Sequence, residues 1–204
     1  INDLITDLKT DGMILNNGAY FEFHNEELFS SIISINEISN LLLYGFYLEF
    51  NTLNERLRIQ DSNLFKEYSS LFNIKESVKV SSLNEIKPYS LIALTTNPEN
   101  DYANLFPNLD FERISQYAFE VKNKNINKSS PVELLKMKFD NYKIISFLYN
   151  KNDLDLAHLS DIIIAMENGD MSLHNFAGFI TKSCANDGLY FAFDTYLRGL
   201  YEEA

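Results

Sequence analysis

The sequence predicts a predominantly α-helical α+β fold, with antiparallel helices in the C-terminal half and a small β element in the N-terminal half. Apolar residues recur at helical spacing in several stretches of the second half. Glycine and proline number only seven and four, which argues against a turn-rich β-sandwich. With 204 residues, of which 46% are hydrophobic, the chain can bury a substantial core.

The first half mixes helix and strand patterns. Asn25 precedes two glutamates, an arrangement typical of a helix start, and apolar residues follow it at helical spacing. The stretch Leu41–Phe50 suits either a buried helix or a buried strand, and its periodicity does not decide between them. The other expected elements are a helix over 2–9, a turn at 16–18, a strand over 19–23, a helix over 62–72 and strands over 77–82 and 90–96.

The second half begins after a loop over 97–108 that contains two prolines. Beyond it, the apolar spacing predicts five helices joined by short connections. They are expected over 110–122, 131–148, 153–168, 172–182 and 189–203. We expect one domain over 1–204, with a possible division into a mixed part (1–97) and a helical part (109–204).

Charge is unevenly distributed along the chain, whose formal net charge is −12. Ile1–Glu55 has nine acidic residues and one basic residue, and Asn152–Ala204 has nine and two. Arg113–Lys151 has three acidic and eight basic residues. Two acidic ends therefore flank a basic middle, and a surface dense in carboxylates would attract a basic partner.

These bulk properties favour a non-enzymatic acidic binding protein. They are similar to those of bacterial immunity proteins, which block a toxin, and the resemblance is compositional. It implies a basic toxin or nuclease as the partner, bound through exposed acids of both ends. The expected partner-binding residues are Glu22, Glu26, Glu27, Asp153, Asp155, Asp161, Glu167 and Asp170.

An enzyme is the alternative interpretation. Asp155, His158 and Asp161 are spaced three residues apart and could share one edge of a helix, where they would tune an acid–base pair or hold a metal. A hydrolase or transferase would then use this edge. The competing interpretation is a helical turn whose acids lie near its N-terminus and whose histidine is half-buried.

Other chemistry finds little support in the sequence. Cys184 is the only cysteine, so a disulfide within the chain and a multi-cysteine zinc site are excluded. Cys184 could react with the help of His174 and Asp187, but a small structural residue is the better interpretation. No phosphate-binding glycine loop or metalloprotease motif is present, and we expect no cofactor and no metal.

The basic segment Arg113–Lys151 interleaves lysines with aromatic residues, as single-stranded nucleic acid sites do. Seven of its eight basic residues are lysine, however, whereas base and phosphate recognition favours arginine. We therefore interpret it as a solvated lysine face. A helical protein-interaction scaffold is a further alternative. With no apolar run near 20 residues, we expect no membrane span and a cytoplasmic location.

Overall fold

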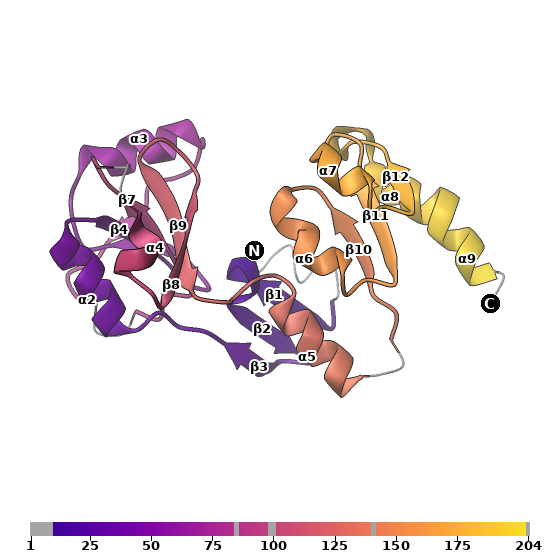
Figure 1. The fold of residues 1–204 in the computed structure, drawn as a ribbon, viewed down its shortest axis with the longest axis horizontal. Helices are drawn as coiled ribbons and strands as arrows, with labels where there is room; N and C mark the ends of the chain where they lie inside the picture. Colours follow the sequence, from indigo (N-terminus) through magenta and orange to yellow (C-terminus); the bar gives the residue numbers. More distant parts are fainter. Residues whose placement is uncertain (1–9, 84–85, 98–100, 140–141, 203–204) are drawn as a thin grey trace. The chain divides into compact units, whose positions relative to one another are not determined.

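The structure is a computed structural model, and it describes residues 10–83, 86–97, 101–139 and 142–202. The helix expected over 2–9 lies outside the described residues. The chain divides into two compact units, unit 1 (Ile1–Asn127) and unit 2 (Lys128–Ala204) (Figure 1). The 97–108 loop falls within unit 1. Whether the units fold as one domain stays a prediction.

The predominantly helical fold class is wrong. The described residues form twelve strands in three sheets, and the fold is α/β. Unit 1 contains the sheets β1-β2-β3 and β6-β5-β4-β7-β9-β8, and unit 2 contains the sheet β10-β11-β12. Several stretches that the apolar spacing predicted to be one long helix instead form a short helix followed by a strand.

The first sheet of unit 1 is an antiparallel meander. Its turn at Asn16–Gly18 has positive φ angles, and the strand expected over 19–23 is confirmed. The helix expected to start at Asn25 is wrong, because His24 and Asn25 adopt φ angles of 51° and 63° and form a tight hairpin turn. The elements are β1 (Gly12–Leu15), the 3₁₀ turn η1 (Asn16–Gly18), β2 (Tyr20–Phe23) and β3 (Glu26–Ser30).

The second sheet of unit 1 has six strands and carries most of the buried core. Its described strand pairs are antiparallel, apart from β5 with β6. Its strands are β4 (Tyr47–Asn51), β5 (Arg56–Arg58), β6 (Val78–Lys79), β7 (Ser90–Leu94), β8 (Leu109–Arg113) and β9 (Ala118–Asn123). Its helices are α2 (Ile35–Tyr44), α3 (Asn63–Leu71) and α4 (Tyr102–Leu105).

The two faces of this sheet are covered by different helices (Figure 1). Successive residues of a strand point to opposite faces. Helices α2 and α4 therefore pack on one face, against side chains such as Leu91 and Val121, in a core that includes Leu48 and Phe50. Helix α3 packs on the other face, where Phe65 contacts the core that includes Ile92. We call this second face the α3 face.

The stretch Leu41–Phe50 is half helix and half strand. Gly45 ends α2 with a φ angle of 104°, a left-handed conformation that glycine adopts at little cost. Its N–H bonds to the carbonyl oxygens of Leu41 and Leu42, and β4 starts two residues later. The helix expected over 62–72 is confirmed as α3, which Ser62 caps by accepting a hydrogen bond from the N–H of Leu64.

The helix expected over 110–122 is wrong, because this stretch forms the β8–β9 hairpin. Phe119 and Val121 belong to the core beneath α2, while Ala118 belongs to the core of the α3 face. This alternation has a period of two, which identifies a strand. The apolar residues also fit a helical spacing, so the sequence pattern alone was ambiguous.

Unit 2 is a parallel sheet covered on both faces. One face packs against α6 and α7 through Ala157 and Leu173, and the other packs against α8 and η4 through Ala192 and Leu197. Its strands are β10 (Ile145–Leu148), β11 (Ile162–Met166) and β12 (Phe179–Thr181). Its helices are α5 (Ser130–Lys138), η2 (Lys151–Asp153), α6 (Leu154–Ala157), α7 (Met171–His174), η3 (Cys184–Asn186), α8 (Gly188–Ala192), η4 (Phe193–Leu197) and α9 (Arg198–Glu202).

The expected C-terminal antiparallel helices are therefore wrong for the stretches 131–148, 153–168 and 172–182. Each begins with a helix and ends with a parallel strand. A parallel strand buried on both faces is a continuous apolar run, such as Ile162-Ile163-Ile164, and shows no alternation. The final stretch, 189–203, is helical through residue 202.

Within the described residues, no helix has both the length and the apolar character that crossing a membrane requires.

Gly188 allows the chain to turn closely from β12 into α8. A Cβ atom at this position would lie 1.9 Å from the carbonyl oxygen of Lys182. We expect Gly188→Ala to lower the free energy of unfolding by about 1–3 kcal/mol, because backbone atoms must move. Chemical denaturation measures the change.

The matched control is Gly199→Ala at an exposed position of α9, where an added Cβ would lie more than 4 Å from every described atom outside its chain neighbours and the nearby backbone of its own helix. This change should raise stability by about 0.5–1 kcal/mol, since alanine favours helix. Equal effects of the two changes would contradict the close approach at Gly188.

Candidate functional site

The carboxyl ends of the parallel strands of unit 2 are the first place to look for a site, because open α/β sheets bind ligands at that edge. Strand β10 ends at Leu148 and leads into the 3₁₀ turn η2. The loop after β11 reaches this turn, since the N–H of Asp170 donates to the carbonyl oxygen of Tyr149 over 2.8 Å. The two loops are therefore held together by backbone contact.

A buried aspartate organises this edge. Asp153 is only 7% exposed. Its Oδ2 accepts the backbone N–H groups of Tyr149 and Asn150, both at 2.9 Å. Its Oδ1 lies 2.5 Å from the Nζ of Lys128. One carboxylate thus fixes the turn after β10 and Lys128, which lies two residues before α5.

These contacts decide the ionisation of Asp153. Burial raises the pKa of its carboxyl group, but hydrogen bonds from Lys128 and the two backbone N–H groups outweigh burial. The net pKa therefore lies below its usual value, and the carboxylate stays ionised near neutral pH. An ionised Asp153 keeps the ammonium group of Lys128 in place.

Lys128 brings a partly exposed positive charge to this edge of the sheet. Its side chain is 30% exposed, and its Nζ also lies 3.4 Å from the Oδ1 of Asn152. It is positioned from one side by Asp153 and Asn152 and remains accessible from the other. Helix α5 begins two residues later, and a helix N-terminus also favours anions. The arrangement can bind an anionic group such as phosphate.

The described residues support a metal site less well than they support anion binding at Lys128. In the described stretches of the chain, no three His, Cys, Asp or Glu side chains lie close enough to hold a metal ion. At the ligand-facing edge, Asp170 is engaged as the N-cap of α7, where it accepts the N–H of Ser172 over 2.8 Å. We therefore derive no step through a metal.

The sequence-predicted acids do not gather at this edge as a group. Glu22, Glu26 and Glu27 lie in the first sheet of unit 1, and Glu22 accepts the hydroxyl of Tyr20 over 2.7 Å. The remaining five acids lie in unit 2. They are Asp153 and Asp170, which flank the site, exposed Glu167 after β11, exposed Asp155 in α6, and Asp161 before β11.

The expected edge of Asp155, His158 and Asp161 does not form on one helix. Helix α6 ends at Ala157, and the carboxylate of Asp161 accepts the N–H of Ile144 over 2.8 Å at the amino end of the sheet. This position is opposite the ligand-facing edge of the strands.

The residues considered for cysteine chemistry are likewise engaged elsewhere or exposed. The Nε2 of His174 lies 3.1 Å from the carbonyl oxygen of Met166. Cys184 is exposed. Its interpretation as a small structural residue stays a prediction.

Sequence reasoning missed Lys128, which it placed on a solvated lysine face. A polar run, Asn150–Asp153, is separated from the strand Ile145–Leu148 only by Tyr149, and this change from apolar to polar residues could have indicated the edge of the sheet. The lysine itself carries no local signal, because its partner lies 25 residues away in the sequence.

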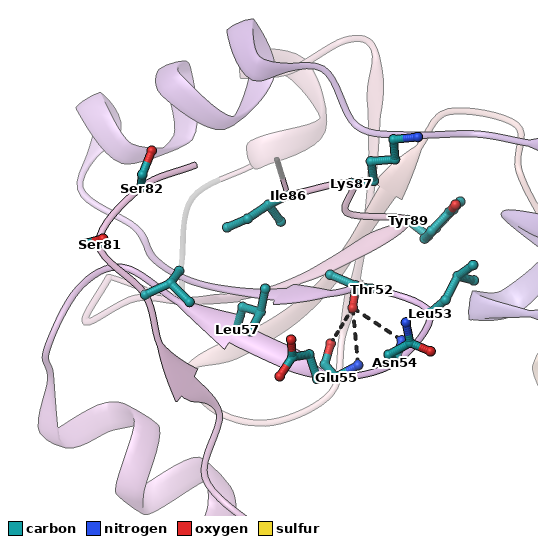
Figure 2. Close-up of a pocket in the computed structure, with 11 residues that line it drawn as sticks. Thr52, Leu53, Asn54, Glu55, Leu57, Ser81, Ser82, Ile86, Lys87 and Tyr89 are labelled. Carbon is teal, nitrogen blue, oxygen red and sulfur yellow. Dashed lines mark hydrogen bonds between the residues drawn. The ribbon is translucent and has the colours of Figure 1, made fainter. Parts of the chain in front are cut away.

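A pocket of about 630 Å³ lies in unit 1 beside the β4–β5 turn (Figure 2). The hydroxyl of Thr52 accepts the N–H groups of Asn54 and Glu55 and donates to the carbonyl oxygen of Glu55. The turn therefore satisfies its own polar groups. In Figure 2, Leu57 and Ile86 contribute apolar side chains, and the amine of Lys87 points away from them. Few fixed polar groups remain to orient a ligand.

The fold and the site define an α/β protein with a phosphate-compatible cation at the carboxyl end of a parallel sheet. The family of haloacid dehalogenase-like hydrolases matches residues 1–193 of the sequence. The chain belongs to this family. A comparison with curated proteins finds no match.

Several solved structures have a fold similar to that of this chain. A hypothetical protein from Geobacillus kaustophilus has a TM-score of 0.84 at 17% identity, covering 95% of this chain and 79% of its own. The phosphatase BT1666 from Bacteroides thetaiotaomicron has a TM-score of 0.78 at 16% identity, with coverages of 93% and 76%. The sugar phosphatase BT4131 has a TM-score of 0.70 at 19% identity, with coverages of 95% and 79%. At these identities the likeness establishes the fold.

Family membership corrects the functional expectations. The chain is not a non-enzymatic inhibitor or immunity protein, because it belongs to a family of hydrolases. A basic toxin or nuclease is therefore not the expected partner. The acidic composition that suggested an inhibitor is a bulk property, and it does not identify a docking surface.

Asp153 makes stability depend on pH. An acid whose pKa is lowered by folding stabilises the protein above the unfolded-state value of about 3.9, and this contribution is lost as the pH falls through the folded value. We expect Asp153→Asn to reduce the free energy of unfolding at pH 7 by about 1–3 kcal/mol. The difference from the unmodified protein should shrink as the pH falls from 5 to 2.5.

Denaturant titrations at several pH values measure this difference. Asp155→Asn, an exposed change in the neighbouring helix, serves as the control and should have little effect. A stability loss in Asp153→Asn that is the same at every pH would contradict the ionised carboxylate.

Proposed function

We propose that the protein hydrolyses phosphate monoesters of small molecules, with the edge formed by Lys128, Asn152 and Asp153 as its phosphate-binding part. The reaction converts R–O–PO₃²⁻ and water into R–OH and hydrogen phosphate. The observation that carries the proposal is the buried Asp153, which holds an accessible Lys128 ammonium at the carboxyl end of β10. Family membership supports hydrolysis as the reaction class.

Lys128 would stabilise the phosphoryl group as its bond to the leaving oxygen breaks. Phosphoryl transfer depends on positioning and on neutralising charge at the phosphate oxygens. Asp153 would act as a positioning residue, because its carboxylate restricts where the ammonium group can lie. The backbone groups of Tyr149 and Asn150 keep that carboxylate in place.

The substrate class follows from the same edge and from the similar structures. A single lysine suits one phosphoryl group better than an extended polyanion, which needs several cations. The phosphatase and the sugar phosphatase among the similar structures support a phosphate ester of a small metabolite. A cytoplasmic location is also a proposal, consistent with a chain that has one cysteine.

Replacing Lys128 tests the proposal. We expect Lys128→Ala to lower kcat/KM for p-nitrophenyl phosphate by about 10²–10³-fold, the usual loss when a group that stabilises transition-state charge is removed. Binding of inorganic phosphate, followed by ³¹P NMR, should weaken in parallel. This second readout does not require turnover.

Lys136→Ala is the matched control, because Lys136 is an exposed lysine in α5. Its phosphate release should equal that of the unmodified protein. Identical rates and identical phosphate binding in the Lys128 and Lys136 variants would overturn the assignment of Lys128.

A further inference from the structure

A second pocket of unit 1 lies on the α3 face of the six-stranded sheet. Its volume is about 570 Å³, within the range of about 300–1,000 Å³ typical of small-molecule sites. Its lining includes Asn51, Arg56, Tyr68, Phe72, Ile92 and Glu120.

The pocket exists because α3 covers only part of this face. Phe65 and Tyr68 of the helix pack on Ile92 and on other apolar residues of β7 and β9. Beyond the helix, the face becomes polar, with Asn51 on β4, Arg56 on β5 and Glu120 on β9. The pocket therefore joins an apolar wall to a polar one.

Arg56 is fixed before any ligand arrives. Its Nη1 donates to the Oε1 of Glu49 over 2.8 Å, and its Nη2 donates to the carbonyl oxygen of Lys75. Glu49 is fully buried, and its Oε2 has no hydrogen-bond partner among the described residues. Burial raises the pKa of the Glu49 carboxyl group, against the opposing charges of Arg56 and Arg58.

The other polar side chains are also held in place. The Oε1 of Glu120 accepts the Nδ2 of Asn17 over 2.7 Å, and the Nδ2 of Asn51 donates to the Oγ of Ser90 over 2.9 Å. Burial raises the pKa of Tyr68 to about 12, so its hydroxyl keeps its proton and can donate. Groups fixed in this way bind a ligand with little loss of side-chain entropy.

The charges of this region indicate what kind of ligand it takes. Among the lining residues, Arg56 and Lys75 are positive and Glu120 is negative. Charges of both signs line the pocket, and the carboxylate of Glu120 disfavours a polyanion. Planar amide, carboxylate and guanidinium groups offer both donors and acceptors to hydroxyl groups. The side chains of Phe72 and Ile92 offer an apolar surface to a ring.

We propose that this pocket binds a neutral, polyhydroxylated ring, either a free sugar or a cyclitol. Its hydroxyl edge would face Asn51, Arg56 and Glu120, and its C–H face would contact the apolar wall. All the lining residues belong to unit 1, whereas Lys128 belongs to unit 2, so this proposal and the proposed hydrolysis rest on different residues.

The test uses the full chain and four probes: D-glucose, D-mannose, D-ribose and myo-inositol. Saturation-transfer NMR and calorimetry should detect saturable binding of at least one probe. Binding should change little between low and high salt, because the ligand is neutral. Glu120→Gln and Tyr68→Phe should each weaken it by roughly fivefold to tenfold, the usual cost of one lost hydrogen bond.

Glu67→Gln, at an exposed position of α3, is the matched control and should bind as the unmodified protein does. Thermal unfolding confirms that each variant is folded, and Lys75→Ala provides a further pocket variant at an exposed residue. The absence of saturable binding, equal affinity in all variants, or preference for inorganic phosphate would overturn the proposal. If sugar binding is absent but the pocket variants keep their phosphatase activity, the pocket proposal is wrong and the proposed role of Lys128 is unaffected.

Discussion

The contact on which the candidate site depends is the one between Asp153 and its three donors. Two are backbone N–H groups of the turn after β10, and the third is the ammonium group of Lys128. A buried carboxylate is costly without such partners, so the turn and the lysine are fixed together. The local backbone thereby positions a charge that belongs to another segment of the chain.

Unit 1 uses the same principle on a larger surface. Fully buried Glu49 anchors Arg56, whose guanidinium group also holds the segment at Lys75 through its carbonyl oxygen. The two faces of the six-stranded sheet therefore differ in composition. One packs a continuous apolar core beneath α2 and α4, whereas the α3 face combines packing with an ordered set of polar groups. A sheet face with fixed polar groups is suited to recognition.

The sequence could predict elements whose signals are local. Ser62 identifies the start of α3, and the apolar run of β7 identifies a strand. It could not predict the parallel strands, because their pairing joins distant segments and a fully buried strand lacks alternation. The sequence identified one of the two main site residues. It selected Asp153, but as an exposed acid, whereas Asp153 is buried. Lys128 was missed, since only the fold brings it to Asp153.

The single cysteine has a practical consequence. Cys184 is exposed in the turn η3, and its N–H donates to the side chain of Asn168, which follows β11. Because the chain has no other thiol, a maleimide dye attaches at one defined place in unit 2. Fluorescence from such a dye would report on the loops after β11 and β12 without any engineered residue.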